Sequence, residues 1–179
     1  MTDAIQNEYA LFPNEGNPGE IADFQTATDG LEDGSRSASE VVYFGEGVMS
    51  TAADPRTVRA PTSAAEAARC TGVVVRDNNS VGSGTGGYPV GWLVRLLRRG
   101  RIRVRCETAC KDGQQAYLRF ATGVADTTQL AGAWRNDAGT ESSAKAAAVP
   151  GAIFRTTTAS TGKVVWLELN LEGQALTAE

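Results

Sequence analysis

The stretch YPVGWLVRLLRRGRIRVRCETAC, residues 88 to 110, is the most informative part of the chain. Apolar and basic residues alternate in it on both sides of Arg99 and Gly100. Alternation with a period of two is typical of a β-strand with one buried face. A turn at Arg99-Gly100 would pair Leu97 with Ile102. The stretch therefore predicts a β-hairpin.

The two faces of this predicted hairpin differ in chemistry. One face is expected to pack on the core, with Arg95 as its one charge, and carries Leu93, Leu97, Ile102, Val104 and Cys106. The other is basic, with apolar side chains between the charges, and carries Trp92, Val94, Leu96, Arg98, Arg101, Arg103 and Arg105. A solvated face, a contact with acidic protein neighbours and a grip on nucleic-acid phosphates all remain open for it. The net charge of −4 makes nucleic acid an unfavoured partner.

Outward from this stretch, short β-type runs alternate with turn residues from Glu40 onwards. Strands are expected at 41–49, 58–61, 70–76, 90–98, 101–108, 114–121, 130–135, 152–157 and 163–171. Loops are expected at 78–87 and 136–148. A short helix is expected at 63–69, because Ser63 can cap it and alanines follow. Many short strands with glycine-rich turns favour an all-β fold, a jelly-roll-like sandwich or a small barrel with at most one or two short helices.

The N-terminal region has a different composition from the rest. Residues 1 to 40 hold nine acids and one base, whereas residues 41 to 179 hold 12 acids and 16 bases. Prolines, glycines and few apolar residues predict an irregular acidic arm over residues 1–38, followed by a β-rich domain over 39–179. The apolar residues of the arm suit an extended strap that orders on contact, although a disordered tail is equally compatible with the isolated chain. They are Tyr9, Leu11, Phe12, Ile21 and Phe24.

Catalytic and metal-binding patterns are weak. The chain has no histidine, the most common general base and metal ligand. Cys70, Cys106 and Cys110 are expected to be buried free thiols, and they are too few for a zinc site. Carboxylates such as Glu107, Asp112 and Glu168 could meet in space, but no spacing marks them as a catalytic pair. We therefore expect a protein that is not an enzyme and takes no cofactor or metal, with no signal peptide and no membrane segment.

Several short sequence words occur in an order that resembles the structural cement (capsid decoration) proteins of tailed bacteriophages. They are GEIAD at 19–23, VVYFGEGV at 41–48, VRAP at 58–61, GVV at 72–74, YPVG at 88–91, DG at 112–113, VPGAIF at 149–154 and GKVVWLEL at 162–169. The words cover about nine-tenths of the chain. The arginine-dense stretch and the long glycine-rich loop depart from the pattern.

The resemblance implies a non-enzymatic virion protein, made in the bacterial cytoplasm. It implies a protein that binds the outer surface of the mature head and clamps neighbouring major capsid subunits. Such proteins are symmetric oligomers, with a homodimer or a homotrimer as the options here. On this hypothesis the contacts to capsid subunits or sister copies come from the arm and the hairpin, through Tyr9, Phe12, Ile21, Phe24, Trp92, Arg98, Arg101, Arg103 and Arg105. The alternatives are a head-completion or tail component, and a single-stranded nucleic-acid-binding β-barrel.

Overall fold

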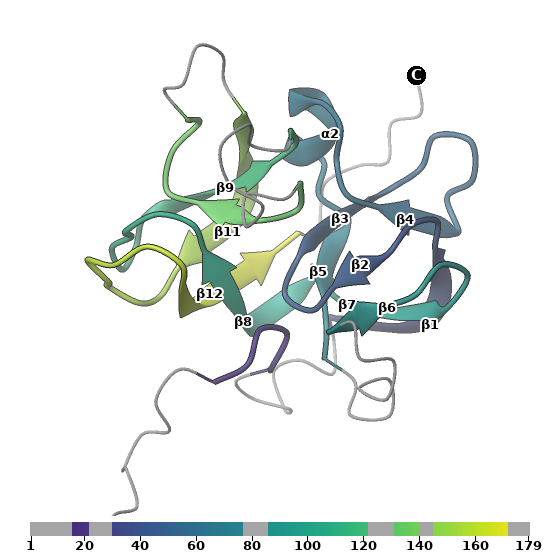
Figure 1. Cartoon of the computed structure of the whole chain (residues 1–179), viewed down its shortest axis with the longest axis horizontal. Helices are drawn as coiled ribbons and strands as arrows, with labels where there is room; N and C mark the ends of the chain where they lie inside the picture. Colours follow the sequence, from purple (N-terminus) through teal and green to yellow (C-terminus); the bar gives the residue numbers. More distant parts are fainter. Residues whose placement is uncertain (1–15, 22–29, 77–85, 122–130, 140–144, 172–179) are drawn as a thin grey trace, which may run out of the picture.

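The β-strands form two closed barrels of five strands each, which lie side by side (Figure 1). The computed structural model describes residues 16–21, 30–76, 86–121, 131–139 and 145–171. The first barrel consists of β1 (Leu31–Ala38), β3 (Gly47–Ser50), β4 (Thr57–Arg59), β5 (Gly72–Val74) and β7 (Leu93–Leu97). The second consists of β8 (Arg99–Cys106), β9 (Gln115–Arg119), β10 (Trp134–Arg135), β11 (Ala146–Phe154) and β12 (Lys163–Asn170). A separate two-stranded sheet joins β2 (Val42–Tyr43) to β6 (Gly87–Tyr88).

The two barrels share one topology. In each, the first strand in sequence pairs in parallel with the third and antiparallel with the fifth. The second strand pairs antiparallel with the third and the fourth, and the fourth pairs antiparallel with the fifth. Strands β8 and β9 begin 68 residues after β1 and β3. The chain therefore builds the same small barrel twice, and the expected all-β class is confirmed.

Apolar packing joins the barrels. Val74 of β5 points into the interior of the first barrel, whereas its neighbours Val73 and Val75 belong to the larger cluster that fills the second barrel. From the second barrel, Trp134 contributes a fully buried ring to that cluster, and its Nε1 donates a hydrogen bond to the carbonyl oxygen of Gly45 at 3.0 Å. Burial of each such side chain contributes about 1.5–3 kcal/mol. Strand β5 therefore separates the two hydrophobic cores and contributes side chains to both.

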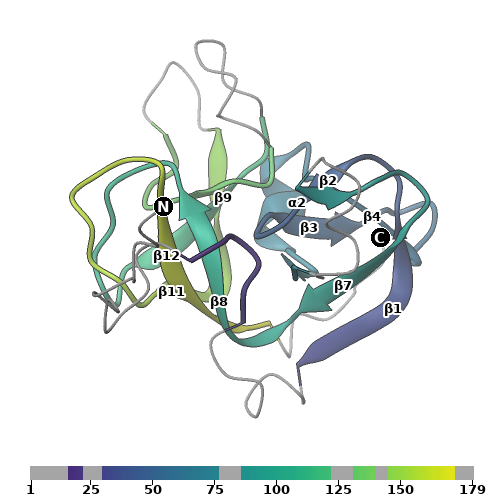
Figure 2. The same ribbon diagram turned by 60° about the horizontal axis from the view of Figure 1, so that its bottom comes forward.

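The predicted hairpin is wrong. Strand β7 pairs with β1 and β5 of the first barrel, and β8 pairs with β12 of the second. At Arg98 the chain passes from one barrel to the other (Figure 2). Leu96 and Leu97 are both fully buried, but Leu96 packs inside the first barrel and Leu97 packs in the larger cluster. Two consecutive core residues break the alternation that a hairpin requires.

Because β7 pairs with strands of the first barrel, several of its side chains face the opposite way from the prediction. Val94 and Leu96 are buried, not on the surface, and Leu93 is 61% exposed, not in the core. In the second half the expected core residues Ile102 and Val104 are fully buried. The side-chain alternation is therefore confirmed for β8, whereas in β7 it is reversed at residues 93, 94 and 96 while Leu97 is buried as predicted.

Four other expectations can be compared with the structure. The helix is confirmed as α2 (Ala64–Ala68), with the Ser63 side chain accepting a hydrogen bond from the Glu66 amide. The three cysteines are free and buried, as expected. Residues 31–38 were expected to be irregular but form β1, and the expected loop 136–148 is shortened because β11 begins at Ala146. A glycine in the left-handed region at Gly34 and the bulge between Asp33 and Arg36 explain why β1 lacks a regular sequence pattern.

Candidate functional site

Strands β8 and β12 form the longest pairing in the structure, with eight paired residues. Their inward side chains fill the second barrel. The outward side chains place arginines beside a tryptophan and a glutamate, because Arg103 pairs with Trp166 and Arg101 with Glu168. We call this surface the basic face, and define it as Arg99, Arg101, Arg103, Arg105, Arg155, Trp166 and Glu168.

Arg103 lies at the centre of the basic face. Its guanidinium carbon sits 4.6 Å from the centre of the Trp166 ring, and its Nη1 lies 3.0 Å from Oε2 of Glu20. Partial burial raises the pKa of Glu20, but hydrogen bonds from Asn17 and the guanidinium of Arg103 outweigh it and hold the pKa below its usual value. Contacts on two sides and a side chain that is only 17% exposed give Arg103 a fixed position.

Arg101 and Arg155 share a single carboxylate. The Nε atoms of both lie 3.0 Å from Oε2 of Glu168, and Asp112 is 3.9 Å from Arg155. Hydrogen bonds, first from Arg155 and then from Arg101, lower the pKa of Glu168. Because these side chains are exposed, the ion pairs add little to stability.

Arginines outnumber carboxylates on this surface. Among the described residues, the four arginines Arg101, Arg103, Arg105 and Arg155 have three carboxylates in ion-pair contact, those of Glu20, Glu168 and Asp112. Arg105 is exposed at the end of β8. A planar, weakly hydrated guanidinium suits bidentate contact with a carboxylate of a partner. The basic face is therefore suited to an acidic protein surface.

The segment Gly16–Ile21, which we call the anchor segment, lies against β8 (Figure 2). The Gly19 amide donates to the Arg103 carbonyl at 2.7 Å, the Arg103 amide donates to the Glu20 carbonyl at 2.8 Å, and Ile21 forms a bridge with Ile102. Gly19 also accepts a hydrogen bond from the Arg76 amide of the first barrel at 2.8 Å. The anchor segment thus ties the two barrels together beside the basic face.

Only a glycine fits at Gly19. Its φ of +84° is in the left-handed region, and a Cβ there would lie 2.8 Å from the Arg76 nitrogen and 2.9 Å from Cβ of Phe44. The close approach lets the anchor segment reach both barrels.

The structure brings together part of the predicted contact set. Arg101, Arg103 and Arg105 lie on one face, as predicted, and Ile21 lies beside that face with its side chain packed against the core. Trp92 is on the first barrel, and Arg98 is partly buried between the barrels, so neither belongs to the basic face. Tyr9, Phe12 and Phe24 lie outside the described residues.

Several residues of the surface were not predicted from the sequence. Trp166 was placed only in a strand, Glu168 only in that strand and among three carboxylates that could meet in space, and Arg155 and Glu20 were not singled out. The alternation of 163–171 placed Trp166 and Glu168 on one side of their strand, but only the β8–β12 pairing shows that this side continues the arginine row.

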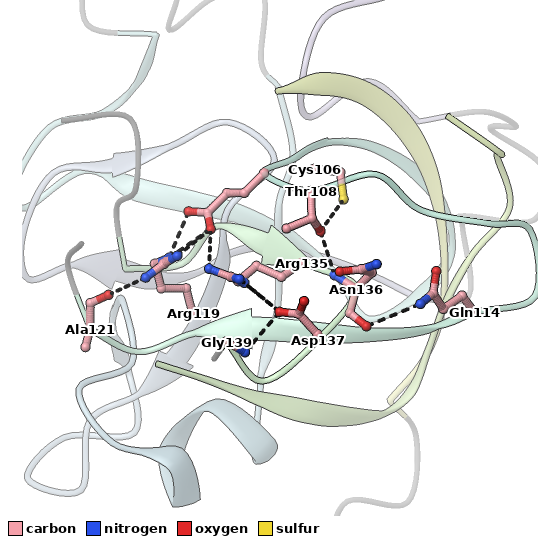
Figure 3. A network of polar contacts seen from close by, with 10 residues as sticks. Cys106, Thr108, Gln114, Arg119, Ala121, Arg135, Asn136, Asp137 and Gly139 are labelled. Atoms are coloured by element: carbon pink, nitrogen blue, oxygen red, sulfur yellow. Dashed lines mark hydrogen bonds and ion pairs between the residues drawn. The ribbon is translucent and has the colours of Figure 1, made fainter. Parts of the chain in front are cut away.

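A second polar cluster lies at the end of the second barrel (Figure 3). Glu107 receives hydrogen bonds from Nε of Arg119 on both carboxylate oxygens at 2.9 Å, and Nη1 of Arg135 is 3.5 Å from its Oε2. Arg135 continues the chain of contacts to Asp137 at 2.9 Å. Two arginines and two carboxylates balance in charge, and Arg119 is only 1% exposed. This cluster connects the ends of β8, β9 and β10 and has the character of structural support.

Among the residues that the structure describes, no group of three or more cysteine, aspartate or glutamate side chains could hold a metal ion. No helix in those residues combines the length and the apolar character that crossing a bilayer requires. Burial raises the pKa of Cys70 and of Cys110 to about 12, so these thiols are protonated at neutral pH.

Comparison with known proteins agrees with this picture. The model of the structural cement protein family (E217 gp24/Pam3 gp6) matches residues 5–170. A chain from the solved structure titled "The capsid of Myoviridae Phage XM1" has the same fold, with a TM-score of 0.64 and 15% identity over 93% of this chain and 98% of that one. None of the curated proteins compared with the sequence matches it. Because the family model spans nearly the whole sequence, the chain belongs to the structural cement protein family.

Proposed function

We propose that this protein is a capsid cement of a tailed phage, which binds the outer surface of the mature head and clamps neighbouring major capsid subunits. The observation that carries the proposal is membership of the cement family over residues 5–170. A role in the virion follows from it, and the work of the protein is structural rather than catalytic.

The basic face is the surface that we assign to the capsid. Its excess of arginine over carboxylate calls for acidic side chains on the partner, and its central residue Arg103 is held in place before any contact is made. Pre-organised arginines lose less conformational entropy on binding. Arg101 and Arg105 are exposed on both sides of Arg103 and are the residues that we expect to contact capsid carboxylates directly.

The described part of the chain begins beside this surface, because the anchor segment holds Gly16 against the guanidinium of Arg103. A chain of 15 residues can extend up to about 50 Å. We propose that Tyr9 and Phe12 of the arm contact a neighbouring subunit, so that one copy spans a subunit boundary. Many copies on a repeating shell would stabilise the mature state by mass action and avidity.

Cosedimentation with purified shells that lack the protein tests the proposal. We expect saturable binding to expanded shells, at a copy number close to that of the major capsid protein, and weaker binding to unexpanded shells. The double variant Arg101→Glu/Arg105→Glu should weaken binding tenfold or more, since charge reversal replaces attraction by repulsion, at about 1.4 kcal/mol per factor of ten.

A matched control separates the basic face from a general charge effect. Arg56, which precedes β4, and Arg69, which follows α2, are exposed outside the basic face. Arg56→Glu/Arg69→Glu makes the same change in net charge and should leave shell binding unchanged. Equal weakening by the two double variants would contradict the assignment of the basic face. Absence of binding of the wild type to either kind of shell would contradict the cement proposal, and a few copies per particle would indicate a head-completion or tail component.

A further inference from the structure

The side of β8 that faces away from β12 is a sheet edge along most of its length. Strand β8 lies between β12 and β10 in the second barrel, but among the described residues β10 pairs with it at Cys106 alone. Unpaired backbone groups at such an edge are a template for pairing with another extended chain. Residues 19–21 of the anchor segment take that place (Figure 2). The anchor segment is therefore an added strand that comes from the chain itself.

Three hydrogen bonds of this added strand end at Arg103. Its carbonyl oxygen accepts from the Gly19 amide at 2.7 Å, and its amide donates to the Glu20 carbonyl at 2.8 Å. Its Nη1 donates to Oε2 of Glu20 at 3.0 Å. The ring of Trp166, whose centre is 4.6 Å from the guanidinium carbon, supports the side chain in this position. One residue thus binds the anchor segment with both its backbone and its charge.

Apolar packing contributes little to the docking of the anchor segment. Ile21 is its one branched apolar side chain, and it is only partly buried against the core of the second barrel. The bond from Asn17 to Oε1 of Glu20 at 2.8 Å lies within the segment and does not tie it to a barrel. Segments with few buried apolar contacts open at a low cost in free energy. The contacts with Arg103 therefore carry a large share of the docking.

The docked segment also satisfies a backbone group of the first barrel. The Arg76 amide, two residues after the end of β5, donates to the Gly19 carbonyl at 2.8 Å. The guanidinium carbon of Arg76 lies 5.6 Å from the centre of the Phe44 ring, which keeps this residue beside the anchor segment. When the segment leaves β8, the Arg76 amide loses its acceptor. An event at Arg103 in the second barrel is therefore reported by an amide in the first.

We propose that the anchor segment is an ionic latch over the edge of β8, which the ion pair between Glu20 and Arg103 keeps closed. Loss of this ion pair releases residues 16–21 from both barrels. The backbone groups of Arg103 that bind Gly19 and Glu20 are then open, and an extended segment of a partner protein can pair with them as a new strand. The inference goes beyond the proposed function, because the latch operates in the free protein.

Amide hydrogen exchange of the free full-length protein, resolved by residue with NMR, tests the latch. In Glu20→Lys the amides of Arg103 and Arg76 should exchange about tenfold faster than in the wild type, with an unchanged circular dichroism spectrum. Glu168→Lys is the matched control, since it makes the same change in net charge on the same face and breaks the ion pairs of Arg101 and Arg155. Those pairs do not involve the anchor segment, so both amides should keep the wild-type rate.

Salt gives a second arm of the experiment. Raising NaCl from about 0.05 M to about 1 M shortens the Debye length to about 3 Å and weakens exposed ion pairs. The Arg76 amide should then exchange faster in the wild type, whereas its rate in Glu20→Lys should not increase. A wild-type rate for this amide in Glu20→Lys, faster exchange at Arg103 alone, or equal acceleration by Glu168→Lys would overturn the inference. Cosedimentation with shells tests the proposed function separately, so each of the two can fail while the other holds.

Discussion

Two carboxylates in this protein each hold two arginines, and they differ mainly in burial. Glu107 contacts Arg119 at 2.8 Å and Arg135 at 3.5 Å, and its side chain is 9% exposed. Glu168 contacts Arg101 and Arg155, both at 3.0 Å, and its side chain is 36% exposed. Replacing each carboxylate with alanine therefore compares the loss of buried ion pairs with the loss of exposed ones.

We expect very different losses of stability. Glu107→Ala leaves the guanidinium of Arg119, which is 1% exposed, without its anionic partner. Breaking a buried pair in this way costs about 3–5 kcal/mol, because an uncompensated charge stays in the core. Glu168→Ala breaks exposed pairs and should cost less than about 1 kcal/mol. The first loss is a large part of the total stability of about 5–15 kcal/mol that a protein of this kind has.

Urea unfolding at neutral pH measures both values, with an unchanged dependence on urea concentration as the sign of an unchanged fold. The double variant Glu107→Leu/Arg119→Met removes both charges and should recover most of the loss. A loss below about 1 kcal/mol for Glu107→Ala, or equal losses for the two alanine variants, would refute the conclusion that the Glu107 cluster supports the second barrel.

Three further predictions concern the junction of the barrels, the anchor segment and the thiols. Burial raises the pKa of the Glu46 carboxyl from its usual value of 4.5 to about 8. Between these two pH values the folded state keeps a proton that the unfolded state has released, so the free energy of unfolding should fall as the pH rises and level off above about 8. The pKa shift limits this loss of unfolding free energy to about 5 kcal/mol, and partial exposure of the side chain makes the loss smaller. The difference in unfolding free energy between wild type and Glu46→Gln should therefore change over this pH range. A constant difference would contradict the raised pKa of Glu46. Gly19→Ala should cost more than Gly162→Ala in urea unfolding, since both glycines have positive φ but a Cβ at Gly162 meets nothing within 4 Å; equal costs would mean that the contacts of Gly19 do not matter. The three cysteines should react with a thiol reagent only after unfolding, and rapid labelling of the native protein would show that they are accessible.

The local features of the fold could be read from the sequence. Alternation identified the inward Ile102 and Val104, and Ser63 marked the start of the helix, because both signals depend on neighbouring residues only. Strand partners depend on contacts between distant residues. Gly100 suggested a hairpin turn. The pairing of eight residues between β8 and β12 outweighs the stabilisation that a two-residue turn could provide. The consecutive leucines at 96 and 97 indicate, in the sequence itself, that the chain passes from one hydrophobic core to the other.

The candidate site was predictable to the same extent. The arginines of β8 were found because their alternation is local, and their common face is confirmed. Trp166 and Glu20 come from strands and segments that are distant in sequence, so their place beside Arg103 needed the structure. The duplicated barrel was also hidden, because its corresponding strands begin 68 to 77 residues apart and share topology rather than an obvious sequence motif.

The position of the anchor segment has a consequence for the order of events during synthesis. Each barrel comes from one continuous stretch of chain, so the first can form while the second is still being made on the ribosome. The anchor segment leaves the ribosome before either barrel, yet its docking strand β8 belongs to the barrel that is completed last. We therefore expect the arm to stay unattached through most of translation and to be secured beside the basic face only when the whole molecule is finished.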